Sequence, residues 1–269
     1  MAEKKVVIFL VEGWSELNAF ESPFDIIFSK HKYHDKKCIV KFGYINNNNL
    51  RSGFGGDITS DRNVNSKNIK QKILEWMIKP LLTSFYAEDI EEVVHIVDMD
   101  GAFIPNENIV PKTSDTEKNV IYGDGKIFAR CPEKIIKRNE QKQKNLNCLL
   151  STSTIVIKHI IHSNKFKGKG NDKGELHRAV VPYSVYYFSS NLDHYIHYDA
   201  NLRDSEKTRK ATSFCHKCLG NMDLFYKIFV NDVDSVSNIS YINSWKYIKD
   251  GINSIKRHTN LGIFIKNIK

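Results

Sequence analysis

The chain has 269 residues, of which 41% are hydrophobic and 26% are charged, and its 40 Lys and Arg against 31 Asp and Glu give a net charge of +9, a composition that excludes a disordered chain. The apolar run at residues 6–11 is too short for a signal peptide or a membrane span, which argues against a membrane partner. Five scattered cysteines are unlike the even set of a secreted disulfide scaffold, so we expect a cytoplasmic protein.

The excess positive charge is concentrated in one segment, residues 126–173. This segment contains twelve basic and three acidic residues, whereas the rest of the chain contains twenty-eight of each. Concentrated charge attracts an anionic partner, and nucleic acid is the first candidate. Basic side chains of this segment, and a polar group near the C-terminus, are expected to hold phosphates. The candidate nucleic-acid-binding residues are Lys134, Lys137, Arg138, Lys142, Lys144, Lys167, Lys169, Arg257 and His258.

The first hundred residues alternate between β-branched apolar runs and apolar residues at helical spacing, which is typical of a parallel sheet with crossover helices. We predict strands at residues 6–11, 38–45 and 93–97, and helices at residues 17–28 and 69–81. The first strand should lie inside the sheet because it is apolar on both faces. Ser22 and Pro23 favour a kink or a restart in the first helix. The polar loop at residues 46–56 is longer than most connections, and its length favours a functional role.

Polar residues interrupt this alternation after residue 101. Residues 122–126 predict a hairpin because Asp-Gly favours a tight turn. A helix is predicted at residues 132–150, a Gly- and Lys-rich loop at residues 165–174, a fourth strand at residues 180–188, and a mostly helical chain from residue 204 onward. The chain is therefore divided into an α/β domain at residues 1–200, with a basic insertion at residues 102–178, and a helical C-terminal extension at residues 201–269.

Carboxylates follow two of the predicted parallel strands. Glu12 follows the first strand, and Asp98 and Asp100 end the third. Functional residues of open parallel sheets gather at the carboxyl ends of strands, and we expect these two strands to be neighbours. Clustered carboxylates repel one another unless a cation lies between them, and hard oxygen ligands select Mg²⁺ or Mn²⁺. The pattern favours phosphoryl chemistry, with Glu12 as a candidate base for the attacking water.

These residues resemble the Toprim (topoisomerase-primase) domain, in which a strand ending in Glu-Gly is followed two elements later by a strand ending in Asp-x-Asp. The fourth strand and residues 191–194, Asn-Leu-Asp-His, are similar to the later acidic element of RloB-type and OLD-type nucleases of phage defence. The resemblance implies a Toprim-like sheet and a metal-dependent nuclease that acts on DNA, RNA or tRNA in abortive infection. It implies catalytic roles for Glu12, Asp98, Asp100 and Asp193, of which the first three would bind metal. At Asp193 the sequence has Asp in place of Glu, and the aromatic residue of that element is missing.

Two other interpretations stay open. Residues 96–102 also resemble the first motif of haloacid-dehalogenase-type phosphatases, with Asp98 as nucleophile and Asp100 as acid or base, although Asp232 and Asp234 make a poor closing motif. Alternatively, the acidic residues are structural in a non-catalytic module that binds nucleic acid or is regulated by a partner. The chain has no Gly-x-x-x-x-Gly-Lys-Ser/Thr motif, so any ATP-driven control would come from a separate ATPase or sensor subunit.

Overall fold

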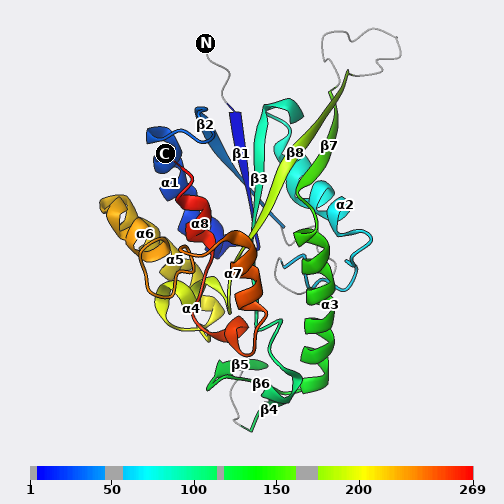
Figure 1. Cartoon of the computed structure of the whole chain (residues 1–269), viewed down its shortest axis with the longest axis vertical. Coiled ribbons are helices and arrows are strands. Elements are labelled where there is room, and N and C mark those ends of the chain that lie inside the picture. The colour runs from blue at the N-terminus through cyan, green and yellow to red at the C-terminus, as the bar shows by residue number, and fades with distance from the viewer. Residues whose placement is uncertain (1–4, 46–56, 114–117, 162–174, 269) are drawn as a thin grey trace.

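A five-stranded sheet with the strand order β2-β1-β3-β8-β7 forms the centre of the computed structural model, which describes residues 5–45, 57–113, 118–161 and 175–268 (Figure 1). Its strands are β1 (Lys5–Val11), β2 (Cys38–Tyr44), β3 (Ile90–Asp98), β7 (Thr154–Ile161) and β8 (Glu175–Phe188). β1 pairs in parallel with β2 and β3, and β3 pairs in parallel with β8, whereas β7 is antiparallel to β8. The predicted α/β class, with a mostly parallel sheet and β1 in its interior, is confirmed.

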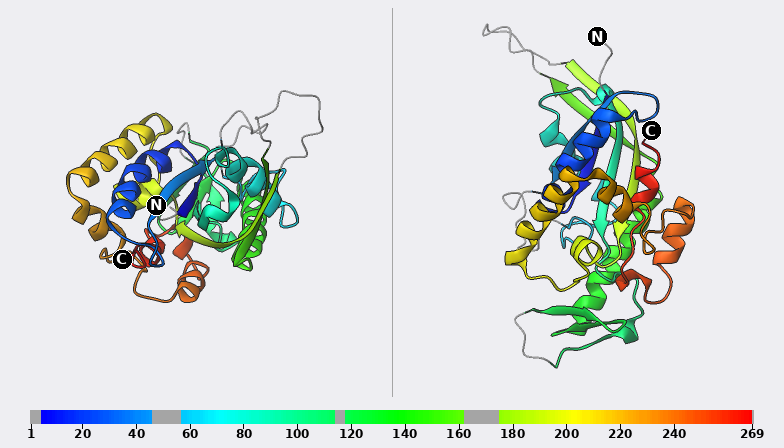
Figure 2. Two further views of the ribbon diagram at one scale, coloured as in Figure 1. Left: turned by 90° about the horizontal axis from the view of Figure 1, so that it is seen from above. Right: turned by 90° about the vertical axis from the view of Figure 1, so that its left-hand side faces the viewer.

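Helices cover both faces of this sheet, as the view from above shows (Figure 2). One face carries α1 (Trp14–Lys30), α4 (Leu192–His197), α5 (Asp204–Gly220), α6 (Met222–Phe229) and α8 (Leu261–Ile265). The other carries α2 (Ile69–Ile73), a π-helical turn at Leu74–Ile78, α3 (Pro132–Leu150) and α7 (Tyr241–Ile248). Short 3₁₀ turns lie at Lys79–Leu81, Ala87–Asp89, Asn106–Asn108 and Asn253–Ile255. Because both faces are covered, successive residues of β1 enter opposite cores: Val6, Ile8 and Leu10 on one side, Val7, Phe9 and Val11 on the other.

The predicted restart in the first helix is wrong. Pro23 lies inside α1, which runs without interruption from Trp14 to Lys30. Pro23 is buried together with Phe20 and Phe24, so the packing of this helix face against the sheet outweighs the cost of proline in a helix.

The chain between β3 and β8 forms a second, three-stranded sheet and also adds the strand β7 to the five-stranded sheet. β4 (Ile109–Pro111), β6 (Lys126–Ala129) and β5 (Val120–Gly123) form a small sheet in that order, at the lower end of the molecule in Figure 1. The predicted hairpin joins β5 to β6 through Asp124 and Gly125, both with positive φ. The predicted helix at residues 132–150 is α3. The sequence analysis did not predict β7, which adds an antiparallel edge strand to the main sheet. The predicted loops at residues 46–56 and 165–174 lie outside the described residues.

The C-terminal region completes both helical layers. Phe225 and Phe264 enter the core beneath α1, whereas Trp245 enters the core on the opposite face. Thr259 bridges to Phe188 at the end of β8. The predicted helical extension at residues 201–269 therefore packs directly on the α/β sheet.

Candidate metal centre

Glu12 follows the last residue of β1 and links the ends of two adjacent strands. Its Oε1 accepts a hydrogen bond of 2.9 Å from the backbone N–H of Asp98, at the end of β3. The two strands pair in parallel through Leu10 and His95, so both chains leave the sheet at the same edge. The predicted convergence of Glu12 with the end of the third strand is therefore present.

The backbone turns sharply after β3, and this turn sends the two aspartates in different directions. Asp100 and Gly101 both have positive φ, of 49° and 69°. A Cβ atom on Gly101 would lie 2.5 Å from Cγ2 of Ile255 and 2.7 Å from Cδ1 of Ile127, so a larger residue does not fit there. Oδ1 of Asp98 accepts a hydrogen bond of 3.1 Å from the N–H of Leu192 at the start of α4, whereas Asp100 turns toward Glu12.

Asp57 completes the acidic group, and the sequence analysis did not name it. It is the first described residue after the polar loop at residues 46–56, whose length was the available signal. Its Oδ1 accepts a hydrogen bond of 2.8 Å from the N–H of Thr59, and its Oδ2 accepts one from the Ser60 hydroxyl. These contacts hold Asp57 over the ends of β1 and β3.

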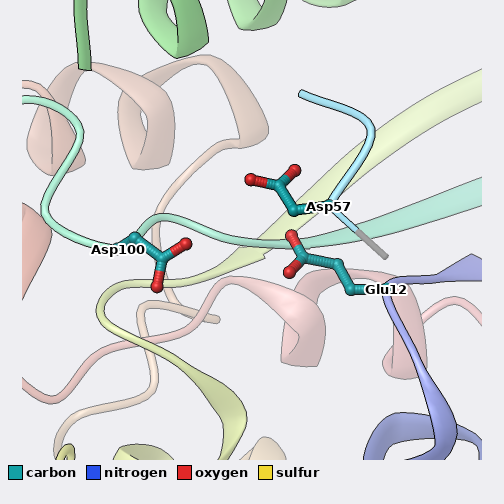
Figure 3. Close-up of side chains that lie close together, drawn as sticks. All are labelled: Glu12, Asp57 and Asp100. Carbon is teal, nitrogen blue, oxygen red and sulfur yellow. The ribbon is translucent and has the colours of Figure 1, made fainter. Parts of the chain in front are cut away.

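Three carboxylates thus face a common space (Figure 3). Glu12, Asp57 and Asp100 each offer one oxygen, and these oxygens lie within 4.8 Å of one another. Within the described residues no other set of His, Cys, Asp and Glu side chains meets this spacing. Asp98, which the sequence analysis placed among the metal ligands, is not in the set because its carboxylate is turned toward α4.

Lys142 of α3 lies inside the acidic group. Its side chain is fully buried, and its Nζ is 2.8 Å from Oδ2 of Asp57 and 3.0 Å from Oδ2 of Asp100. One turn earlier, Arg138 donates a hydrogen bond of 2.7 Å to the backbone oxygen of Asp100. Assigning Lys142 to a surface that binds nucleic acid was wrong, because the acidic groups facing α3 draw its ammonium group inward, and the half-buried Arg138 is held by the turn that carries Asp100. Both residues are instead part of the candidate metal centre.

Burial and mutual repulsion shape the protonation of this centre. Burial raises the pKa of Glu12 well above its ordinary value, Asp57 raises it further, and Lys142 opposes the rise. Burial also acts to raise the pKa of Asp57, but the charge of Lys142 and the hydrogen bonds from Lys142, Ser60 and Thr59 outweigh it and lower the pKa to about 2. Burial acts to lower the pKa of Lys142, yet its acidic neighbours raise it. The Asp57–Lys142 pair therefore favours its charged form, whereas Glu12 binds a proton more readily than an exposed glutamate does.

A second acidic group lies beside the first. Burial raises the pKa of Asp98, and the nearby charge of Glu16 raises it further, with Asp193 contributing less. Asp193 is only 5% exposed, and burial raises its pKa while Lys207 of α5 opposes the rise. Asp193 directly follows Leu192, whose N–H donates a hydrogen bond to Asp98, so Asp193 and Asp98 lie at the same end of the sheet. Sequence reasoning missed Glu16, whose signal was an acidic residue in the first turn of α1.

The remaining basic candidates divide into three kinds. Lys134, Lys137 and Lys144 are exposed on α3 and available to a ligand, whereas Lys167 and Lys169 lie outside the described residues. The guanidinium of Arg257 pairs with Asp232 at 3.0 Å and with Asp234 at 2.5 Å, and it stacks on Tyr195 and Tyr198. Nε2 of His258 lies 2.6 Å from the Tyr247 hydroxyl. Arg257 and His258 therefore make internal contacts. Asp232 and Asp234, the weak candidates for the second acidic motif of a phosphatase, form ion pairs with Arg257.

Comparisons with known proteins identify no relative: no family model, curated protein or solved structure matches the chain. Among the described residues, no helix combines the length and the apolar character needed to cross a membrane.

Proposed function

We propose that the protein is a Mg²⁺- or Mn²⁺-dependent nuclease that hydrolyses phosphodiester bonds. One observation carries the proposal: Glu12, Asp57 and Asp100 come from three separate segments and bring carboxylate oxygens within 4.8 Å of one another at the carboxyl edge of a parallel sheet. Buried like charges repel, so a fold that gathers them must compensate them with cations. Lys142 supplies one positive charge, which leaves the group negative when all three carboxylates are ionised.

The three carboxylates fit a small divalent cation in chemistry and in spacing. All donors are hard oxygens, which suit Mg²⁺ and Mn²⁺. Oxygens on opposite sides of a bound Mg²⁺ are about 4.2 Å apart, because each Mg–O distance is about 2.1 Å. A separation of up to 4.8 Å therefore requires only small movements of the side chains. A bound divalent ion would polarise a phosphate and lower the pKa of a water molecule.

Two residues of the centre have further roles in this proposal. Glu12 has a raised pKa, so its carboxylate is suited to accept a proton from the attacking water. Lys142 has its ammonium group at the carboxylates, where it would stabilise negative charge developing on the phosphate once it releases one aspartate. Arg138 positions the turn that carries Asp100.

Nucleic acid is the substrate class that the surroundings favour. The same helix that delivers Lys142 to the centre exposes Lys134, Lys137 and Lys144 to solvent. These cations are suited to hold phosphates flanking the one at the carboxylates. The resemblance to Toprim nucleases supports the same substrate class. From that resemblance we extend the proposal to phage defence through abortive infection, under the control of a separate ATPase or sensor subunit.

The test is an assay of the full chain against single-stranded DNA, duplex DNA, RNA and tRNA, with Mn²⁺, Mg²⁺ or EDTA. We expect cleavage of at least one substrate with metal and none with EDTA. Glu12→Gln and Asp100→Asn should each reduce cleavage by at least about a hundredfold, the scale expected for losing a general base or an electrostatic stabiliser. Glu140→Gln is the matched control, because Glu140 is exposed on α3, and it should keep full activity.

The same assay, extended by a small phosphomonoester as a further substrate, separates the proposal from its two rivals. A haloacid-dehalogenase-type phosphatase would release phosphate from a small phosphomonoester, and Glu12→Gln would leave most of that activity intact. A non-catalytic module would bind the nucleic acid and leave it uncut under every condition. Metal-dependent cleavage that survives in Glu12→Gln would also contradict the proposed mechanism.

A further inference from the structure

Trp14 is exposed beside the candidate metal centre. It is the first residue of α1, and only Gly13 separates it from Glu12. Its side chain is 57% exposed. In contrast, Trp245 is buried in the hydrophobic core, and Trp76 packs against that core. A large apolar ring that stays exposed next to a cluster of functional residues is a candidate contact for a ligand.

The indole of Trp14 rests on a second aromatic ring. Its centroid lies 5.0 Å from that of Tyr44, with the two rings inclined at 53°. Tyr44 ends β2 and pairs in register with Val11, the residue before Glu12. Tyr44 also packs against the hydrophobic core that contains α1. The sheet therefore supports one side of the indole, and the aromatic surface loses little conformational entropy when a ligand binds.

The aromatic pair and the basic helix flank the carboxylates. Trp14 lies on α1, which covers one face of the sheet, and α3 covers the other face and delivers Lys142 to the centre (Figure 1). Two residues span at most about 7 Å of chain, so Trp14 remains close to Glu12. A strand whose phosphate lies at the carboxylates would meet lysines on one side and an aromatic ring on the other.

Stacking on such a ring requires a base whose face is free. In a duplex, neighbouring base pairs cover both faces of each base, whereas an unpaired base can stack on an aromatic side chain. We propose that Trp14, supported by Tyr44, stacks on an unpaired base next to the phosphate at the candidate metal centre. The preferred substrate is then a single strand or a locally unpaired segment. This inference rests on the proposed function for its substrate class, but binding tests it without cleavage.

Binding of the full chain to labelled strands of about 12 nucleotides in EDTA tests the inference, since strands of this length fill a single-strand site. The probes are a single strand, the same strand with abasic positions that keep the phosphates, and a duplex, each measured by fluorescence anisotropy. We expect Trp14→Ala to weaken binding of the single strand by roughly 5- to 150-fold, the range of one base–aromatic stack. Trp14→Phe should keep most of the affinity. Ile242→Ala, which alters an exposed apolar residue on α7, is the matched control.

The abasic strand identifies the contact. Wild type and Trp14→Ala should bind it equally weakly, because it carries no base to stack. Unchanged affinity of Trp14→Ala for the base-bearing strand, or equal losses on all three probes, would overturn the inference. So would a wild-type dimer that Trp14→Ala converts to a monomer, since a second copy would then cover the ring. Adding Mn²⁺ separates the two proposals. Binding that depends on Trp14 but leads to no cleavage contradicts only the proposed nuclease activity. Cleavage that is unchanged in Trp14→Ala contradicts only the proposed stacking on Trp14.

Discussion

Nζ of Lys142 lies 2.8 Å from Oδ2 of Asp57, and this ion pair joins the basic helix α3 to a segment 85 residues earlier in the chain. The same nitrogen lies 3.0 Å from Asp100. Two of the three carboxylates that could hold a metal are therefore already paired with an internal cation. A metal ion bound there would compete with Lys142 for these oxygens or share them, so we expect Lys142 to influence the metal affinity of the site.

Replacing Lys142 with a neutral residue of similar length should expose this competition. We expect Lys142→Met to lower the free energy of unfolding in EDTA by about 3–5 kcal/mol, because one partner of a buried ion pair is lost. Mn²⁺ should then raise the melting temperature of the variant more than that of wild type, since no ammonium group competes. Thermal melts with Mn²⁺ and with EDTA measure both effects. Lys144→Met, which is exposed on the same helix, should behave as wild type. A smaller Mn²⁺ shift in Lys142→Met would contradict the competition.

Asp57 and Asp98 should differ in their contribution to metal binding. Asp57 belongs to the group within 4.8 Å, whereas Asp98 accepts a hydrogen bond from α4. Metal at a hundred times its dissociation constant from the protein should raise the free energy of unfolding of wild type by about 2.7 kcal/mol. Asp57→Asn should lose most of this gain, and Asp98→Asn should keep the larger part. Each variant is compared with its own melt in EDTA, so that differences in basal stability cancel. Loss of the gain in Asp98→Asn alone would make Asp98 the ligand and contradict this geometry.

The exposed lysines of α3 should set the salt dependence of nucleic-acid binding. Each phosphate contact contributes about 0.7 to the slope of log affinity against log salt for a single strand. Changing Lys134, Lys137 and Lys144 together to Gln should therefore lower the slope by about 2. Arg138 is left unchanged because it is half-buried and donates a hydrogen bond to the backbone oxygen of Asp100. The control changes Lys30, Lys32 and Lys37 to Gln, three exposed lysines at the end of α1 and in the connection to β2. An unchanged slope in the α3 triple variant would remove this face from the interface.

His95 should make the stability of the fold depend on pH. It is buried in β3, with Nδ1 2.7 Å from the Tyr183 hydroxyl. Burial lowers the pKa of His95 from 6.5 to about 4, against the opposing charge of Asp57. The unfolded chain therefore binds the proton more readily, so the contribution to stability is complete above pH 6.5 and is lost as the pH falls toward 4. The loss amounts to about 3 kcal/mol.

Urea unfolding at several pH values measures this effect. Other buried groups titrate as well, so the quantity of interest is the difference between wild type and His95→Gln. Wild type should lose about 3 kcal/mol more than His95→Gln across this window. His31→Gln, at an exposed position, should follow wild type. Parallel loss of stability in wild type and His95→Gln would show that another group is responsible.

Local patterns in the sequence were sufficient for most elements of the fold. The apolar runs at residues 6–11 and 93–97 identified two buried strands, and their adjacency predicted that Glu12 would meet the end of β3. The edge strand β7 was not recognised. Five of its eight residues are Ile or Val, so the strand signal was present in the sequence, and antiparallel pairing with β8 places β7 at the edge of the sheet.

The composition of the site was decided by tertiary structure. Asp57 carries no motif, because it does not follow a predicted strand, and only its proximity to Glu12 and Asp100 in the folded chain makes it a candidate ligand. Lys142 lies among exposed lysines of one helix and resembles them in sequence. Burial of an ammonium group costs too much unless acidic partners are present, and here they come from residues 42 and 85 positions away. The sequence by itself therefore determined the sheet and the edge at which the carboxylates gather, because both follow from local patterns of apolar residues. Which charges meet at that edge depends on contacts between distant segments, and only the tertiary structure decided it.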